Sequence, residues 1–171
     1  MLAAQTRQRD DLPSNAHADH ESIASDYQSL VEHHLATLAQ AAVTVSRSRP
    51  TYRPAQLWLL GELTRALFTD PPTVGLIEGS LGLNKSDRAR LATNIERALS
   101  QAQTLWQRAT RTGLPFRWDF NLLPGAKLDP ARQAAWLSCD PSLPTQYVIA
   151  PGYIVEQQVF CLQRVLTGPS F

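Results

Sequence analysis

The distribution of proline constrains the fold of this chain more than any other feature, because it divides the 171 residues at Gly113. Proline lacks a backbone N–H and interrupts helices, and seven of the twelve prolines lie after Gly113. Before Gly113, hydrophobic residues recur at the spacing of a helix face. The sequence therefore predicts an α+β fold, with three or four helices within residues 22–112 and a small antiparallel sheet within residues 114–168 that packs against the last helix.

The N-terminal segment differs from the rest of the helical part. Residues 1–21 are polar and acidic, and they predict a disordered lead-in to a single domain of residues 22–171. Helices are then expected where apolar residues recur at helical spacing. Each such segment is preceded by a serine or proline that can begin a helix or is followed by a proline-rich stretch that ends it. The predicted segments are 22–45 (capped by Ser22 or Ser25), 54–69 (with Pro54 in its first turn) and, weakened by two glycines, 73–82.

The element with the clearest signals is a long helix over residues 85–112. Asn84 is a favourable N-cap with Asp87 three residues later, and Gly113 accepts the left-handed conformation that ends many helices. One side of this helix is apolar, and the opposite side is basic and polar. The basic side carries Arg90, Asn94, Arg97, Gln101, Thr104, Arg108 and Arg111.

Beyond Gly113 the chain is expected to form short strands. Residues 116–120 alternate between apolar and polar types, as a strand does. Asp129 and Pro130 predict the start of a short helix over residues 131–137. The other β-branched and aromatic runs, 147–150, 153–155 and 159–166, predict strands, with residues 156–158 as a hairpin turn between the last two.

Charge is unevenly distributed in a chain that is nearly neutral. Sixteen Lys and Arg residues against fifteen acids give a net charge of +1, which excludes attraction of a nucleic acid or membrane by the molecule as a whole. Residues 85–117 nevertheless hold seven basic residues and two acids. A solvated face of a structural helix is one interpretation, and a surface for an anionic partner is the other. The candidate nucleic-acid-binding residues are Lys85, Arg90, Asn94, Arg97, Arg108 and Arg111.

The segment 73–97 is similar to a helix-turn-helix motif in the spacing of its apolar residues and turn glycine. Two positions depart from the pattern. Glu78 stands where a small residue lets the two helices approach, and Arg88 stands where an apolar core residue is expected. The positions that match are Ile77, Leu81, Gly82, Leu83 and Leu91.

Helix length limits how much of the basic side can contact one partner. A recognition helix reads bases through its N-terminal turns, so Arg90, Asn94 and Arg97 are the expected groove contacts. Arg108 and Arg111 lie about 27 Å and about 32 Å farther along a straight axis than Arg90, at about 1.5 Å per residue. We therefore expect the distal arginines to miss the same groove.

The strand at residues 116–120 allows a second nucleic-acid interpretation. Arg117 can contact a phosphate while Trp118 and Phe120 stack on unpaired bases. The alternative is that Phe116, Trp118 and Phe120, which share one face of the strand, belong to the core.

The sequence contains none of the motifs GxGxxG, GxxxxGK[ST], GxSxG or HExxH. All four histidines lie within the first 34 residues, so a histidine-dependent catalytic site requires the first helix to fold over the C-terminal half. An enzyme is expected to show a pocket in which an aspartate lies beside a tyrosine. The candidates for such a pair are Asp119 or Asp140 with Tyr147 or Tyr153.

No cofactor or metal ion is expected. His17 and His20 have ligand-like spacing but lie in the acidic lead-in, and Cys139 and Cys161 lack the spacing of a zinc site and are expected to be free thiols. Residues 1–15 have no apolar run of the kind found in signal peptides, and the longest uncharged apolar-rich stretch is shorter than the roughly 20 residues that span a bilayer. A cytoplasmic protein with no membrane partner is expected.

These observations favour a non-enzymatic regulatory or adaptor protein that applies its basic helix face to an anionic partner, with nucleic acid as the first candidate. The alternative is a protein–protein interaction module, homo- or hetero-oligomeric, with no nucleic-acid role. A small enzyme of unknown reaction is the third hypothesis.

Overall fold

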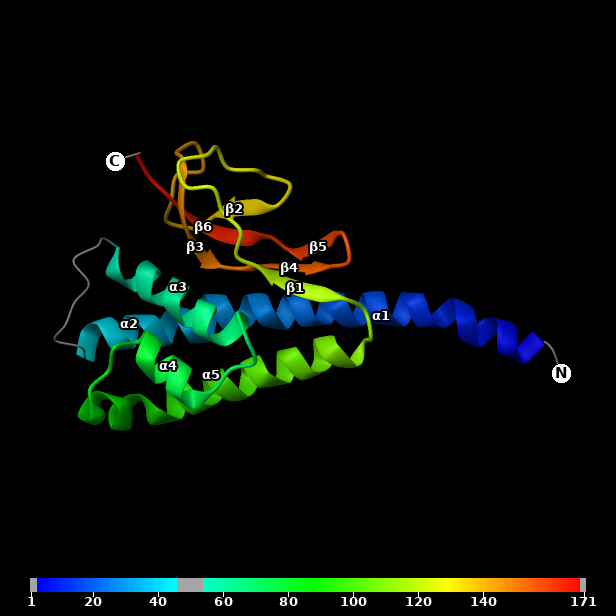
Figure 1. Cartoon of the computed structure of the whole chain (residues 1–171), viewed down its shortest axis with the longest axis horizontal. Coiled ribbons are helices and arrows are strands. Elements are labelled where there is room, and N and C mark those ends of the chain that lie inside the picture. Colours follow the sequence, from blue (N-terminus) through cyan, green and yellow to red (C-terminus); the bar gives the residue numbers. More distant parts are fainter. Residues whose placement is uncertain (1–2, 46–53, 170–171) are drawn as a thin grey trace.

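The computed structural model describes residues 3–45 and 54–169, with side chains from Asn15 onward in the first range. Helices form the N-terminal two thirds and two small sheets form the remainder, so the predicted α+β class is confirmed (Figure 1). The helical segments are α1 (Ala3–Ser29), the π-helical η1 (Leu30–Leu35), α2 (Ala36–Val45), α3 (Ala55–Phe68), α4 (Val74–Ser80) and α5 (Lys85–Arg111). The strands are β1 (Phe116–Asp119), β2 (Gln133–Ala135), β3 (Thr145–Ala150), β4 (Gly152–Val155), β5 (Gln158–Cys161) and β6 (Gln163–Thr167).

The first three helical segments follow one another without a break and lie alongside α5 (Figure 1). The predicted helix start at Ser22 or Ser25 is wrong, because α1 begins at Ala3 and includes residues 15–21 of the expected lead-in. Polar composition suggested a disordered segment, but His20 and Ile23 are buried beneath the C-terminal part of the chain. Tertiary packing can stabilise a helix that its own sequence would not make stable.

The long helix has the predicted ends. The Asn84 side chain accepts a hydrogen bond from the Asp87 backbone N–H at 2.9 Å, and the intervening residues begin α5. Gly113 follows the helix with φ at +74°, a left-handed conformation that glycine adopts without a steric cost. The short glycine-containing helix is also present as α4.

The β-rich part contains two three-stranded sheets rather than one. Strands β1, β4 and β5 form an antiparallel sheet in the order β1-β4-β5, and the predicted hairpin turn joins β4 to β5. The second sheet, in the order β2-β6-β3, is mixed because β2 pairs in parallel with β6. The predicted helix over residues 131–137 is wrong, since Gln133 to Ala135 pair with Gln163 to Val165.

A cluster of aromatic rings joins the helices to the antiparallel sheet. The Trp118 ring centroid lies 4.7 Å from Tyr27, 4.6 Å from Phe68 and 4.5 Å from Tyr153. The Tyr27 hydroxyl donates a hydrogen bond to the Pro151 carbonyl at 2.7 Å. Trp118 is buried, so the hypothesis that its ring stacks on unpaired bases is wrong and the core interpretation is confirmed for this residue.

A close contact between α3 and β3 joins the helices to the mixed sheet. The buried Thr64 hydroxyl donates to the Ile149 carbonyl at 2.7 Å. One turn earlier, a Cβ placed on Gly61 would overlap the Tyr147 ring. Glycine costs about 1 kcal/mol relative to alanine within a helix, and here it lets the Tyr147 hydroxyl pass α3 and reach Glu62 at 2.8 Å.

His20 makes the longest-range hydrogen bond of α1 in the described ranges. It is 1% exposed, and its Nδ1 lies 2.6 Å from the hydroxyl of the fully buried Tyr153. Burial lowers the pKa of His20 from its usual 6.5. The first helix therefore folds over the C-terminal half, as a histidine-dependent site there would require.

We expect acid to destabilise the fold through His20. Because its pKa is lower in the folded protein, the unfolded chain binds a proton more readily, and stability is lost as the pH falls below about 6.5 towards the folded-state pKa. Urea unfolding at about pH 7.5 and about pH 5.5 measures this loss. His20→Gln, which does not titrate, should show a smaller difference between the two pH values, and an unchanged difference would contradict the assignment.

Candidate functional site

The two sides of α5 face in the predicted directions. Its apolar residues Leu91, Ile95 and Leu105 are buried against the other helices. Its basic side forms part of the surface beside α1, η1 and α2. The amphipathic pattern therefore determined how this helix docks.

Four of the predicted site residues lie near the start of α5 and are exposed: Lys85, Arg90, Asn94 and Arg97. We call this group the proximal basic face. Within the described ranges, neither Arg90 nor Arg97 forms an ion pair. These guanidinium groups are available to an external anion.

The distal residues Arg108 and Arg111 have different surroundings. The Arg108 guanidinium is paired with Asp26 at 2.5 Å and donates to the Ser22 hydroxyl at 3.0 Å. Asp26 lies on α1, so the Arg108 charge is neutralised by an acid of the protein at its surface. Arg111 ends α5 and lines a separate cleft against α1 and the β4–β5 hairpin. The structure thus does not join the distal arginines to the proximal basic face.

Two histidines that were not predicted as site residues extend the proximal basic face. His33 and His34 lie in the π-helical segment η1, and they share a groove of about 240 Å³ with Asn94 and Arg97. Short π-helical segments within helices are rare and frequently occur at functional sites. The adjacent histidines are visible in the sequence, but their position opposite Arg97 depends on how η1 packs on α5.

The two departures from the helix-turn-helix pattern interact with one another. The Arg88 guanidinium lies 3.3 Å from the Glu78 carboxylate, and its Nε donates to the Leu83 carbonyl at 3.0 Å. The matching positions behave as the motif requires, since Leu81 is buried and Gly82 has φ at +59°. An ion pair across the turn thus stands where the motif usually has a small residue and an apolar one.

Comparison with protein-family models, curated proteins and solved structures gives no significant match.

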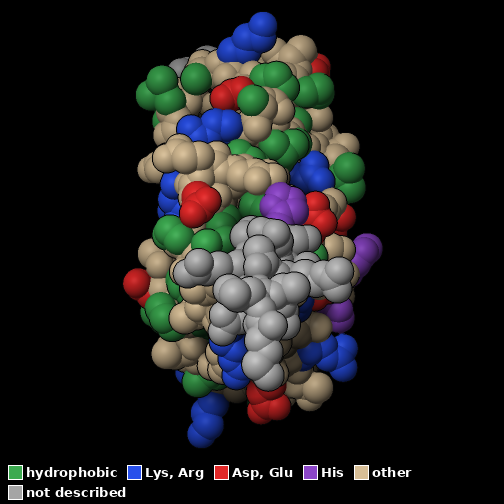
Figure 2. All heavy atoms as spheres, turned by 90° about the vertical axis from the view of Figure 1, so that its right-hand side faces the viewer, with side chains coloured by type: hydrophobic (Ala, Val, Ile, Leu, Met, Phe, Trp, Pro, Cys, Tyr) green, Lys and Arg blue, Asp and Glu red, His purple; other side chains and the backbone are tan. Residues whose placement is uncertain are grey.

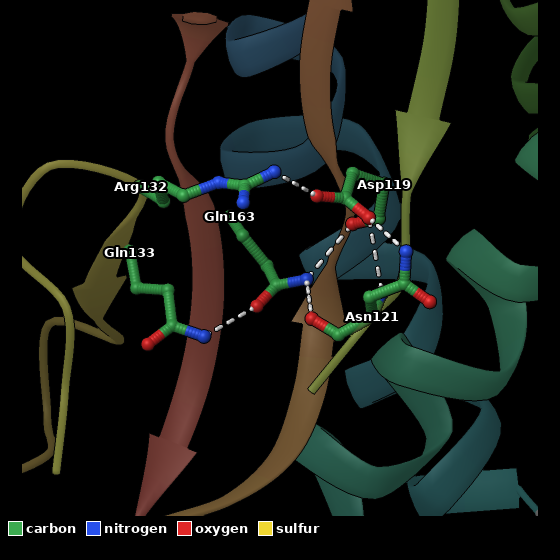
Figure 3. A network of polar contacts seen from close by, with 5 residues as sticks. All are labelled: Asp119, Asn121, Arg132, Gln133 and Gln163. Carbon is green, nitrogen blue, oxygen red and sulfur yellow. Dashed lines mark hydrogen bonds and ion pairs between the residues drawn. The ribbon is translucent and has the colours of Figure 1, made fainter. Parts of the chain in front are cut away.

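The pair of an aspartate and a tyrosine expected of an enzyme does not form at Asp119. This carboxylate is bound by Arg132 at 3.1 Å and accepts from the Asn121 side chain at 2.8 Å (Figure 3). Its cleft of about 180 Å³ is lined mostly by polar side chains, including Gln163, and by neither tyrosine. Tyr147 and Tyr153 instead bind Glu62 and His20.

The other candidate groups show no metal or membrane feature where the structure describes them. Among residues 15–45 and 54–169, no cluster of three His, Cys, Asp or Glu side chains suits a metal ion. No described helix is both long and apolar enough to cross a bilayer. Cys139 and Cys161 are free thiols, and burial raises the pKa of Cys161 to about 11.

Proposed function

We propose that this chain is a non-enzymatic regulatory or adaptor protein that binds the phosphate backbone of a nucleic acid through the proximal basic face. The observation that carries the proposal is that the arginines of α5 differ in whether they are paired with an acid of the protein. Arg88 and Arg108 are held by acids of the protein, whereas Arg90 and Arg97 are exposed and have no acidic partner in the described ranges.

The arrangement of α4 and α5 supports the same function. The turn at Gly82 places the exposed N-terminal turns of α5 at one end of the molecule, as a groove-binding helix requires (Figure 1). The proximal basic face spans about 18 Å from Lys85 to Arg97, at about 1.5 Å per residue. It is long enough for contacts with several phosphates, which are spaced about 1.7 Å apart along a duplex axis.

We expect binding to nucleic acid that weakens steeply with salt. Fluorescence anisotropy with mixed-sequence duplex DNA, single-stranded DNA and RNA, measured between about 50 and 400 mM KCl, gives the slope of log K against log [salt]. Each phosphate neutralised contributes a slope of about 0.9 for duplex DNA. Arg90→Ala/Arg97→Ala should therefore reduce the slope by about 1.8 and weaken binding at low salt.

The matched control is Arg117→Ala/Lys127→Ala, which removes the same charge from exposed positions in the β-rich part. This variant should keep the wild-type slope, and an equal loss in both variants would contradict the assignment to α5. Absence of binding by the wild type at low salt would overturn the function. Binding of a protein partner that does not respond to salt would favour the protein-interaction alternative.

A further inference from the structure

The groove that two adjacent histidines share with the proximal basic face contains no carboxylate. His33 and His34 of η1 form one side of it, and Asn94 and Arg97 of α5 form the other. We call it the histidine groove. Histidine side chains reach the surface of the molecule, and two of them stand above Lys or Arg side chains at the right-hand edge of Figure 2. Among the described residues, no acid lines the histidine groove.

The two imidazole rings have no ionic partner in the part of the chain that the structure describes. His33 is exposed and His34 is half-buried, and neither forms an ion pair there. The nearby Thr37 hydroxyl donates to the His33 backbone carbonyl at 2.6 Å and not to the ring. Imidazole, amide and guanidinium groups all donate hydrogen bonds, and charged donors bind phosphate oxygens most strongly. The histidine groove thus has the donors that a phosphate group requires.

Few charges face the histidines from the elements packed on η1. From α5, Arg97 lines the histidine groove, and Arg108 lines the adjoining pocket, where it pairs with Asp26 of α1. The α2 residues of the groove are uncharged, and α3 adds no residue to either pocket. Glu32, the acid of η1 itself, pairs with Arg164 of β6 at 3.1 Å. No acid left unpaired by these contacts lines either pocket to neutralise a protonated histidine.

Protonation of the histidines and binding of an anion in this groove favour each other. Histidine is the side chain whose charge ordinarily changes between pH 5 and pH 8. A positive charge on His33 or His34 is opposed by Arg97 when the groove is empty, and it is favoured when a phosphate lies between them. Because coupling between two bound groups is reciprocal, protonation must strengthen phosphate binding by the factor by which phosphate favours protonation.

We propose that the histidine groove holds one phosphate of the nucleic-acid backbone and makes binding stronger as the pH falls from about 8 to about 6. This inference rests on the proposed function. At the lower pH, His33 and His34 carry charge and bind the phosphate together with Asn94 and Arg97. At the higher pH the same phosphate is contacted without the histidine charges. The π-helical segment, of a kind that frequently occurs at functional sites, places both rings beside α5.

The test measures anisotropy of a mixed-sequence DNA duplex at about pH 8, 7 and 6, at several KCl concentrations. The phosphodiester groups do not titrate in this range, so a change in affinity reports on the protein. We expect binding to be about fivefold tighter or more at the lowest pH. The slope of log K against log [salt] should rise by about 0.9, for the one phosphate that the groove neutralises. Far-UV circular dichroism at each pH checks that the protein remains folded.

Histidine variants assign the pH response. His33→Gln/His34→Gln cannot gain charge, so its affinity should change less than about twofold between the same pH values. His17→Gln is the matched control, because His17 is exposed on α1 and pairs with Glu21, away from the groove. This control should keep the full pH response of the wild type.

The outcomes separate this inference from the function on which it rests. Salt-dependent binding that is lost in Arg90→Ala/Arg97→Ala but does not change with pH would overturn the role of the histidine groove and leave the proposed function standing. An equal pH response in the wild type and in His33→Gln/His34→Gln would likewise overturn it. Absence of binding at every pH would overturn both.

Discussion

Replacing Trp118 with alanine is expected to lower the free energy of unfolding by about 3–5 kcal/mol, the range measured for large aromatic residues in cores. Trp118 is buried between Tyr27, Phe68 and Tyr153, which come from α1, α3 and β4. Its removal leaves a cavity at the point where helices and sheet meet. Urea unfolding followed by far-UV circular dichroism measures the change without relying on tryptophan fluorescence.

Two further variants show whether this loss comes from the packed ring. Trp118→Phe keeps an aromatic ring and removes an indole N–H that has no partner in the described part of the chain, so it should cost less than Trp118→Ala. Leu137→Ala truncates a side chain that is 82% exposed and should change stability by about 0.5 kcal/mol or less. A decrease in the free energy of unfolding below about 1 kcal/mol for Trp118→Ala would show that the aromatic cluster does not stabilise the junction between the helices and the antiparallel sheet.

Replacing Gln163 with leucine is expected to destabilise the protein by roughly 2–4 kcal/mol, because each buried polar group left without a partner costs about 1–3 kcal/mol. The buried Gln163 amide donates to the backbone carbonyls of Asp119 at 2.8 Å and Asn121 at 3.1 Å. Its oxygen accepts from Gln133 at 2.9 Å (Figure 3). The Gln163 side chain of the mixed sheet is thus hydrogen-bonded both to the backbone at the end of β1 and to the Gln133 side chain of β2.

Urea midpoints of Gln163→Leu and two comparison variants test this network. Gln133→Ala removes the last of these three bonds, together with the exposed bond that its side-chain oxygen accepts from the Asp129 backbone N–H at 3.0 Å, and should cost less than Gln163→Leu. Gln158→Leu makes the same substitution at an exposed glutamine of β5 and should be nearly neutral. If Gln163→Leu were as mild as Gln158→Leu, the network would contribute nothing to the junction of the sheets.

The sequence predicted the elements whose ends are encoded locally. The limits of α5 follow from Asn84, Asp87 and Gly113, which lie within a few residues of the helix ends they define. The β4–β5 turn and the inward face of α5 likewise depend on neighbouring residues. Periodicity and capping are local properties, and they were sufficient for these elements.

The parts that the sequence did not predict depend on distant partners. The part of α1 that precedes Ser22 contacts the β-rich part through His20 and Tyr153, and β2 pairs with β6 through Gln133 to Ala135. Of the candidate site, Arg90, Asn94 and Arg97 were predicted, but the added histidines of η1 and the loss of Arg108 to Asp26 were not. Contacts between helices determine which arginines on the basic side of α5 remain free to bind an external anion. These contacts cannot be predicted from the pattern of neighbouring residues.

The contacts of α1 and η1 with the C-terminal part of the chain bear on how the chain folds during synthesis. Tyr27 binds Pro151 and Glu32 binds Arg164 across separations of 124 and 132 residues. Contacts so distant in sequence slow folding, because a long loop must close before they form. On the ribosome, the first helix emerges long before the strands that it contacts. These contacts are therefore expected to form late in folding, after α1 has packed on α5.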